Sequence, residues 1–377
     1  MTTTKPRSRA AISLPTAVLT AMCLLPITAG AQIFVTNYAK GTVGEYNLDG
    51  TLVNAKLISG LAEPIGIAIS GSTLYVSNNK IGTIGKYTTS GTTISAALLS
   101  ALGSNNSLCF ALSGSNIFVS NFAEDTISNT IGEYTTSGAV VQDPLITELA
   151  GPQGLAVSGG NLYVANSNKA NGIYTVGKYS TSGAAINPAL VTGLDGPLGI
   201  AVSGSTIFVS NFFNGTIGAY TTSGATINRA LIKGLDKPGG IAIAGSHLYF
   251  TNAGKGTVGE YNLNGTVVNA TLISGLDEPI GIAVVITSPS IVSTTQSTTV
   301  NPGASAKFVV VANGTGPLTY KWELNGTPLK NVAGNLSGVT TATLTISRAK
   351  PANAGTYTVV VSNAGGSTSS TVMLKVS

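Results

Sequence analysis

The sequence predicts an all-β protein in which a six-bladed β-propeller is followed by a β-sandwich. A motif typified by LYVSN occurs six times, starting at Ile33, Leu74, Ile117, Leu162, Ile207 and Leu248. Successive motifs start 41 to 45 residues apart, a period typical of propeller blades. Charged residues make up only 9% and Gly fills 47 positions, which suits turn-rich β structure. From Ile286 the repeat stops and a new pattern of alternating strands begins.

Residues 1–31 have the pattern of a cleavable export signal. A basic start ending at Arg9 is followed by an apolar stretch and by Ala29-Gly30-Ala31, which fits the small-x-small cleavage rule. The mature chain is therefore expected to begin at Gln32 and to be secreted, periplasmic or at the cell surface. A membrane anchor is the less favoured alternative, because the stretch is short and interrupted by Pro15 and Pro26.

Removal of the leader changes both the charge and the cysteine content. Of the 19 basic residues, three lie in the leader, so 16 remain against 14 acidic residues. A balance this close to neutral gives little support for nucleic-acid binding. Cys23 is also removed, which leaves Cys109 as the single cysteine and rules out an intramolecular disulfide.

Each repeat has the pattern of four short strands separated by turn residues. A strand such as IGIAIS leads through a Gly-Ser hairpin to the LYVSN-type strand, and an IGxY strand and a final strand follow. The chain begins with the second strand of a unit, and a surplus first strand appears at Pro279–Val285. We therefore expect Gly281–Val285 to pair beside Ile33–Asn37 and to close the domain spanning 32–285, which would remove exposed sheet edges.

The recurring pattern P-x-G-I-A-V, L-Y-V-x-N, I-G-x-Y and G resembles that of the NHL-repeat propellers. More broadly it resembles the six-bladed propellers of the senescence-marker-protein and gluconolactonase superfamily. The resemblance covers roughly Gln32 to Val285 and implies ligand sites over the central channel, on the face where strand one starts and strand two ends. It specifies architecture better than function, because such propellers include both enzymes and binding modules.

The segment 286–377 resembles an immunoglobulin-like domain. Trp322 in YKW would be the core tryptophan, and Tyr357 in Asn353-x-Gly355-x-Tyr357 the tyrosine corner. Val310 and Val359 stand where that family has its two cysteines. The fold is then expected to hold by packing alone.

Ligand-binding candidates follow from the loops on the implied ligand face. Two loops there are enlarged, 122–129 and 167–174, and Phe212 and Phe213 add aromatic surface. Long loops on a rigid scaffold are where binding residues concentrate. The candidates are Glu124, Asp125, Asn129, Lys169, Asn171, Tyr174, Phe212 and Phe213.

Seven of the 14 acidic residues map to the same face, five of them just before Pro-x-Gly turns. Clustered carboxylates could hold calcium, with Glu63 and Glu278 as weak candidate ligands. The alternative, which we favour, is that these acids are ordinary turn residues repeated by duplication. One Asn per repeat forms a ring whose side chains are expected to bond turn backbone rather than ligand: Asn37, Asn78, Asn121, Asn166, Asn211 and Asn252.

The resemblance to gluconolactonase-like enzymes implies a metal bound by a Glu, an Asn in a Pro-Asn-Gly turn and an Asp after the LYVSN-type strand. No Pro-x-Gly turn here carries the Asn, and Asn replaces the Asp in every repeat. The only His, His247, lies in a hairpin on the opposite face, where a surface role is expected, and no Gly-x-Ser-x-Gly elbow occurs. Cys109 is expected to be a small buried residue rather than a reactive thiol.

These observations favour an exported, non-catalytic binding or adhesion protein that requires no cofactor. The propeller face would recognise a protein or a glycan, and the sandwich would act as a spacer or a second binding module. The alternative is a divalent-metal hydrolase of the lactonase type with an altered ligand set. Neither a nucleic-acid partner nor a membrane span in the mature chain is expected.

Overall fold

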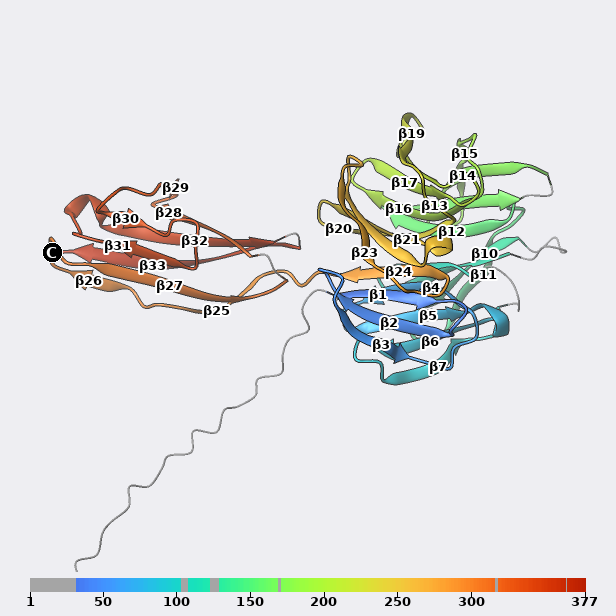
Figure 1. The fold of residues 1–377 in the computed structure, drawn as a ribbon, viewed down its shortest axis with the longest axis horizontal. Coiled ribbons are helices and arrows are strands. Elements are labelled where there is room, and N and C mark those ends of the chain that lie inside the picture. Colours follow the sequence, from blue (N-terminus) through green and yellow to red (C-terminus); the bar gives the residue numbers. More distant parts are fainter. Residues whose placement is uncertain (1–31, 103–107, 123–128, 169–170, 316–317, 364) are drawn as a thin grey trace, which may run out of the picture.

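The computed structural model describes residues 32–102, 108–122, 129–168, 171–315, 318–363 and 365–377. Within them the chain forms six four-stranded antiparallel sheets and a C-terminal sandwich of two further sheets (Figure 1). We number the six sheets along the chain. The all-β fold and the four strands in each repeat agree with the expectation from sequence.

The first three sheets take these strands. Sheet 1 contains β24 (Pro279–Val285), β1 (Gln32–Asn37), β2 (Thr42–Asn47) and β3 (Leu52–Ile58). Sheet 2 contains β4 (Pro64–Ser70), β5 (Thr73–Asn78), β6 (Thr83–Thr88) and β7 (Thr93–Leu99). Sheet 3 contains β8 (Phe110–Ser113), β9 (Asn116–Asn121), β10 (Thr130–Thr135) and β11 (Val140–Ile146).

The next three sheets repeat the order. Sheet 4 contains β12 (Pro152–Ser158), β13 (Asn161–Asn168), β14 (Ile173–Ser180) and β15 (Ala185–Val191). Sheet 5 contains β16 (Pro197–Ser203), β17 (Thr206–Asn211), β18 (Thr216–Thr221) and β19 (Thr226–Ile232). Sheet 6 contains β20 (Pro238–Ala244), β21 (His247–Asn252), β22 (Thr257–Asn262) and β23 (Val267–Ile273). Short 3-10 turns follow β5 and β21: η1 (Asn79–Ile81) and η2 (Ala253–Lys255).

Sheet 1 joins the two ends of the repeat region. β24 pairs antiparallel with β1, with Gln32 opposite Val285 and Val35 opposite Ile282. The predicted pairing of Gly281–Val285 with Ile33–Asn37 is therefore present. The pair satisfies backbone groups on both strands and places Ile33 and Ile282 in one buried cluster shared with sheet 6.

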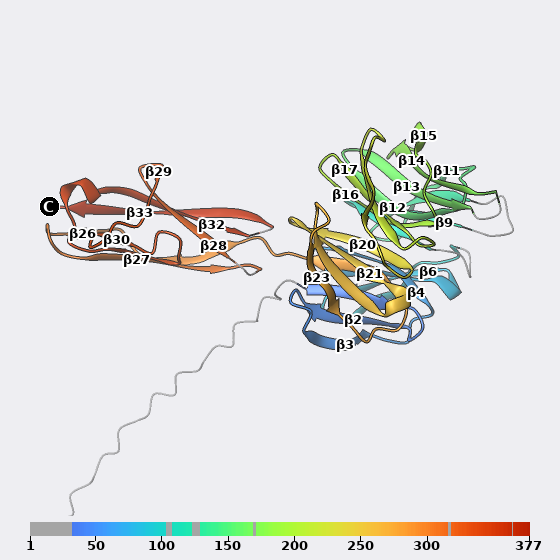
Figure 2. The same ribbon diagram turned by 45° about the horizontal axis from the view of Figure 1, so that its top comes forward.

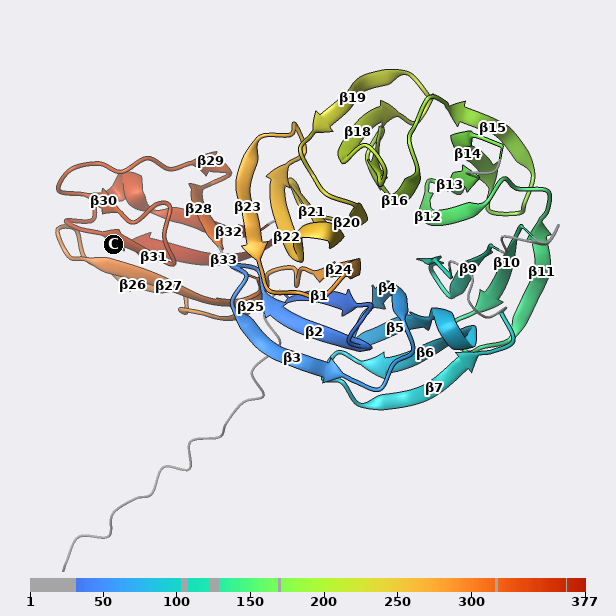
Figure 3. The ribbon, with the colours of Figure 1, turned by 45° about the vertical axis from the view of Figure 1, so that its right-hand side comes forward.

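The first strands of the six sheets lie next to one another. β4 contacts β8, and the series of contacts continues through β12, β16, β20 and β24, which contacts β4 again. Figure 3 shows these strands around the centre of the six sheets. Residues of all six strands line one small cavity of about 120 Å³. Their Pro-x-Gly glycines allow the close approach: a Cβ on Gly281 would lie 2.1 Å from the Ile65 carbonyl oxygen.

The hydroxyl residue before the repeated Asn joins neighbouring sheets. Ser210 Oγ donates to the Gly239 carbonyl at 2.7 Å, which links sheet 5 to sheet 6. Thr251 Oγ1 donates to the Ile280 carbonyl at 2.7 Å, which links sheet 6 to sheet 1. Thr36 Oγ1 donates to the Ile65 carbonyl at 3.1 Å, which links sheet 1 to sheet 2. Buried carbonyls at the sheet boundaries thereby gain partners, a role that the sequence analysis missed.

Side chains on the second and third strands alternate from sheet to sheet. The buried residue at the middle of the second strand is Phe in sheets 1, 3 and 5 and Tyr in sheets 2, 4 and 6: Phe34, Tyr75, Phe118, Tyr163, Phe208 and Tyr249. Their cross-strand partners are Glu45, Lys86, Glu133, Lys178, Ala219 and Glu260. The Phe and Tyr alternation holds in all six sheets, whereas the Glu and Lys alternation of the partners holds in sheets 1 to 4 and is replaced by Ala219 and Glu260 in sheets 5 and 6.

The C-terminal sandwich packs two sheets face to face (Figure 2). One contains β25 (Ser290–Thr294), β27 (Ala306–Asn313), β31 (Thr343–Ile346) and β30 (Leu336–Ser337). The other contains β26 (Thr298–Val300), β33 (Gly366–Val376), β32 (Gly355–Asn363), β28 (Thr319–Leu324) and β29 (Thr327–Pro328). A 3-10 turn, η3 (Pro351–Asn353), precedes β32.

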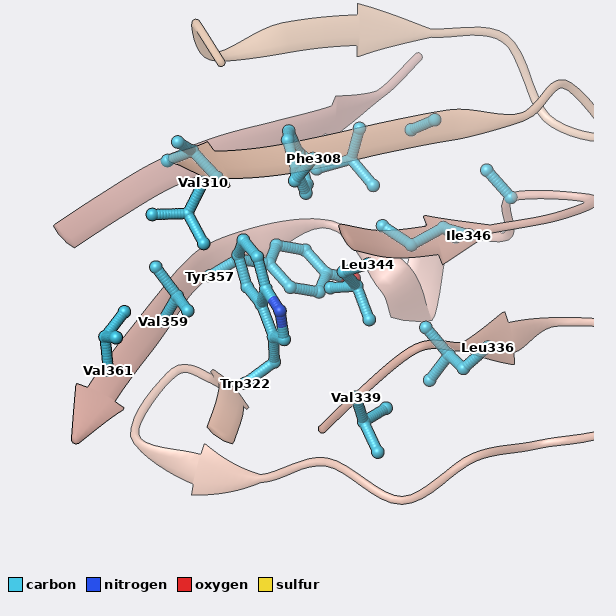
Figure 4. Close-up of a cluster of buried hydrophobic side chains, with 14 residues drawn as sticks. Phe308, Val310, Trp322, Leu336, Val339, Leu344, Ile346, Tyr357, Val359 and Val361 are labelled. Atoms are coloured by element: carbon cyan, nitrogen blue, oxygen red, sulfur yellow. The ribbon is translucent and has the colours of Figure 1, made fainter. Parts of the chain in front are cut away.

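The sandwich core is built around one tryptophan (Figure 4). Trp322 is fully buried, its indole Nε1 donates to the Thr341 carbonyl at 3.0 Å, and its ring stacks at 6.3 Å from Phe308. Val310 and Val359 are buried in the same cluster, so aliphatic packing occupies the places of a disulfide. The Tyr357 hydroxyl donates to the Asn353 carbonyl four residues upstream at 2.7 Å, which is the geometry of a tyrosine corner.

Candidate functional site

The edge where the first strands begin carries an unusual backbone conformation. The residue before the Pro-x-Gly turn has a positive φ in sheets 4 and 5, where it is Gly151 or Gly196. In sheets 6, 1 and 2 the same position is held by Lys237, Glu278 and Glu63, with φ of 54°, 47° and 54°. A left-handed conformation costs a side-chain-bearing residue about 1–2 kcal/mol. Three neighbouring sheets therefore keep a charged residue where Gly would be less strained.

A pocket of about 260 Å³ lies among these residues. Ile65, Leu198 and Ile280 contribute apolar surface, while Tyr38, Phe212, Lys237 and Glu278 contribute aromatic and charged groups. Among the described residues, neither Lys237 nor Glu278 forms an ion pair. Both charges thus remain available to a ligand.

The Tyr38 hydroxyl interacts with the carboxylates of both Glu63 and Glu278. Its hydroxyl donates to Glu63 Oε2 at 2.9 Å, and Lys80 Nζ lies 3.6 Å from Glu63 Oε1. Burial is the largest cause that raises the pKa of Tyr38, followed by the hydrogen bond to Glu63 and the negative charges of Glu63 and Glu278. The phenol therefore stays protonated and acts as a donor at neutral pH.

Three of the predicted aromatic residues form one cluster across sheets 4 and 5. The Phe213 ring lies edge-to-face with Tyr174 at 6.0 Å and with Phe212 at 5.8 Å. Phe213 is 52% exposed, and Phe212 also lines the 260 Å³ pocket. Edge-to-face packing is a favourable geometry for aromatic rings. The cluster extends the pocket with a partly exposed apolar surface.

The remaining predicted contact residues are not brought into this cluster. Asn171 Oδ1 accepts from the Ile173 N–H at 3.2 Å and closes its own turn. The Asn129 carbonyl accepts from the Leu149 N–H at 3.1 Å. Glu124, Asp125 and Lys169 lie outside the described residues.

The repeated Asn side chains bind turn backbone in several sheets. Oδ1 accepts a backbone N–H in Asn78, Asn211, Asn252 and Asn37, at 3.1, 3.1, 2.8 and 3.4 Å. Asn121 and Asn166, which precede the two enlarged loops, differ: their Oδ1 atoms are buried without a partner in the described part of the chain. The Oδ1 atom of the repeated Asn therefore has a backbone partner in sheets 1, 2, 5 and 6 and lacks one in the described part of sheets 3 and 4.

Metal-binding and nucleophilic groups are sparse. The described residues contain no group of three His, Cys, Asp or Glu side chains close enough to hold a metal ion together. Cys109 lines the small central cavity, and burial raises the pKa of its thiol to about 12. The reactive thiolate is thus scarce at neutral pH.

Comparison with known proteins identifies the C-terminal sandwich. Residues 289–376 match the Immunoglobulin I-set domain family. This domain is an I-set immunoglobulin domain. Among curated proteins, none matches the chain.

Solved structures resemble the I-set domain and cover about a quarter of the chain. Titin domain M7 is 31% identical and covers 25% of this chain and 97% of its own, with a TM-score of 0.23. Titin M4 is 26% identical over 25% of this chain and 99% of its own, also with a TM-score of 0.23. The Dscam1 Ig7 domain is 28% identical over 24% of this chain and 97% of its own, with a TM-score of 0.22.

Proposed function

We propose that the six sheets form a closed six-bladed β-propeller of the NHL-repeat type. The pairing of β24 with β1 supports closure, since it joins the end of the repeat region to its beginning. The cyclic series of contacts among the first strands supports it as well. Closure would leave each sheet flanked by two others and remove inner sheet edges.

We further propose that the chain is an exported, non-catalytic binding or adhesion protein. The observation that carries this proposal is the retention of Lys237 and Glu278 at positive φ in one pocket, with Glu63 in the same backbone conformation in the next sheet. Strained backbone clusters at functional sites because function, rather than stability, selects the side chain. The recognition face would consist of these three residues with Tyr38 and Phe212, and the I-set domain would serve as a spacer or second module.

The chemistry of the recognition face favours a ligand with an apolar body and both charges. Ile65, Leu198 and Phe212 offer apolar contact, Lys237 an ammonium group, and Glu278 a carboxylate. A protein segment presents that combination, and a charged glycan presents part of it. A pocket that is mostly apolar with a few placed polar groups fits the general pattern of ligand sites.

A binding screen with the full chain tests this proposal. A peptide array and a glycan array would be probed with the chain of residues 32–377 and with Lys237→Gly and Phe212→Ala variants. Each variant is expected to lose at least about tenfold in affinity for the retained hits without a lower melting temperature. Hits that bind both variants as tightly as the parent chain would place the recognition surface elsewhere.

The alternative function is a divalent-metal hydrolase of the lactonase type. The observation in its favour is that Glu63 and Glu278 both act on the Tyr38 hydroxyl, which brings two carboxylates to one face. One tightly held calcium or zinc ion per chain, lost in a Glu63→Gln variant together with lactonase activity, would establish the alternative. A purified chain without bound metal or lactonase activity would rule it out.

The described part of the chain contains no helix long and apolar enough to cross a membrane. Export rests on residues 1–31, which lie outside the described residues. We keep secretion, with release of the leader before Gln32, as part of the proposal.

A further inference from the structure

Lysine side chains of two even-numbered sheets form hydrogen bonds to the next sheet along the chain. Lys86 of sheet 2 donates to the Thr136 carbonyl in the hairpin of sheet 3 at 3.1 Å. Lys178 of sheet 4 donates to the Thr222 carbonyl in the hairpin of sheet 5 at 3.4 Å. Each ammonium also lies 5.6 Å from the centroid of the cross-strand Tyr ring. The lysine stem thus fills the space between an even-numbered sheet and the next hairpin.

Sheet 6 departs from this arrangement. Glu260 occupies the lysine position opposite Tyr249, and the corresponding hairpin is that of sheet 1 at Leu48. Glu260 instead contacts its own sheet. Tyr249 Oη donates to Glu260 Oε1 at 2.8 Å, and His247 Nδ1 lies 2.5 Å from the same oxygen. The space that a lysine would fill toward Leu48 is therefore left open.

That space belongs to a cleft of about 710 Å³ between sheets 6 and 1 and the I-set domain. Leu48, His247 and Glu260 line it on one side, and Asn363 of the I-set domain lines it on the other. Its volume lies within the range of about 300–1,000 Å³ usual for ligand sites. The Glu260 position, where sheets 2 and 4 have Lys, thus forms part of this cleft.

The I-set wall of the cleft is held in place by a short connection. Val285 still pairs with Gln32 in sheet 1. Thr287 is already bonded to the I-set domain, because its N–H donates to Thr315 Oγ1 at 2.7 Å and its carbonyl accepts from Asn363 Nδ2 at 2.8 Å. Only Ile286 lies between, and it packs against the buried cluster of sheets 6 and 1. The two domains are thus joined through a single residue.

We propose that this cleft binds a neutral, hydroxyl-rich ligand, an oligosaccharide. The carboxylate of Glu260 already receives hydrogen bonds from Tyr249 and His247. Asp49, the other acidic residue of the lining, accepts hydrogen bonds from the N–H and the hydroxyl of Thr51, so neither charge needs a cationic ligand. None of the described lining residues is Lys or Arg, so an anionic ligand would have no countercharge. Ser, Thr and Asn side chains in the lining can both donate to and accept from sugar hydroxyls.

His247 supplies a directed contact for such a ligand. Assignment of the Nδ1 proton to the bond with Glu260 leaves the lone pair on Nε2. The His247 side chain is 35% exposed and lines the cleft. Nε2 is then an oriented acceptor for a hydroxyl group, and Glu260 acts as the residue that positions it.

The test is isothermal titration of the chain of residues 32–377 with cellotriose, maltotriose and triacetylchitotriose. At least one trisaccharide is expected to bind. A Glu260→Lys variant restores the lysine pattern of sheets 2 and 4, fills the cleft and should weaken that binding at least about tenfold. Because the variant reproduces an arrangement already present in this fold, its melting temperature should not fall.

A second blocking variant and a matched control separate blocking from misfolding. Ser246→Trp places a bulky ring in the cleft from the exposed hairpin of sheet 6 and should also abolish binding. Ser205→Trp is the matched change in the hairpin of sheet 5, and it should bind within about twofold of the parent chain. If none of the three sugars binds, or if Glu260→Lys and Ser246→Trp bind as the parent chain does, the proposal is wrong, whatever the result for the recognition face.

Discussion

Glu278 illustrates how backbone conformation and side-chain chemistry oppose each other at a single residue. Its φ of 47° favours Gly, so Glu278→Gly relieves backbone strain of about 1–2 kcal/mol in the folded state. The same change makes the unfolded chain more flexible, which adds about 0.5–1 kcal/mol to the entropic cost of folding. We expect a net gain of about 0.5–1 kcal/mol in the free energy of unfolding, measured by urea titration and circular dichroism. Ligand binding at the recognition face should fall in the same variant.

The neighbouring residue provides the control. Asp277 is acidic too, but its φ is not positive, and its ion pair with Lys40 is long, at 3.9 Å, and exposed. Asp277→Gly should therefore leave stability unchanged or lower it. Equal stabilisation by both substitutions would show that charge removal, and not backbone strain, is responsible.

Tyr357 allows the I-set domain to be tested within the full chain. Trp322 is the only tryptophan, so its fluorescence reports the unfolding of this domain alone. Tyr357→Phe removes the donor to the buried Asn353 carbonyl and should lower the domain's free energy of unfolding by about 1–3 kcal/mol. Tyr320→Phe is a matched change at a partly exposed ring and should lower the free energy of unfolding by less than about 0.5 kcal/mol. Equal losses in the two variants would show that the hydrogen bond from Tyr357 does not stabilise the domain.

At the scale of elements, β24 is the strand on which the repeat region depends most. A chain ending at Val285 keeps β24 and should unfold cooperatively without the I-set domain. One ending at Gly275 lacks β24, so β1 loses one of its two partner strands and the contacts of β24 with β4 and β20 are lost. We expect the shorter chain to aggregate, which gel filtration and thermal melting would show. The same melting temperature for both chains would contradict the importance of β24.

The elements were more predictable from the sequence than the site. The repeated motif predicted all four strands of each sheet, because alternating apolar residues and turn residues recur with it. It also predicted the pairing of β24 with β1, since a missing strand and a surplus strand share one sequence. The immunoglobulin-like sandwich followed from Trp322 and Tyr357, whose buried positions agree with the expected pattern.

The candidate sites depend on contacts that no local pattern encodes. Tyr174 meets Phe213 across two sheets, and the positive φ of Lys237 became visible only in the backbone. The sequence analysis expected a surface role for His247 and overlooked Glu260. His247 lies opposite Asn262 in the ladder, and its side chain reaches Glu260 two residues away on the same strand. The break in the Glu and Lys alternation was the available signal for that pair.

At the scale of the whole molecule, the proposed leader at residues 1–31 would decide where the protein acts. Ala29 and Ala31 fit the small pockets of a signal peptidase. N-terminal sequencing of protein from the medium or periplasm should therefore read Gln-Ile-Phe-Val. A secreted pool that retains Met1 would contradict export by cleavage.

The antiparallel pairing of β1 with β24 also determines how the molecule responds to mechanical force. Gln32 and Val285 face each other at the same end of the ladder, and the chain continues from Val285 into the I-set domain through one packed residue. Tension between a tethered N-terminus and a load on the I-set domain would act on that end first. The bonds would then break one after another, as in unzipping, and not all together, as in shear. The repeat region would thus yield at low force from its joining sheet, while the other five sheets bear little of the load.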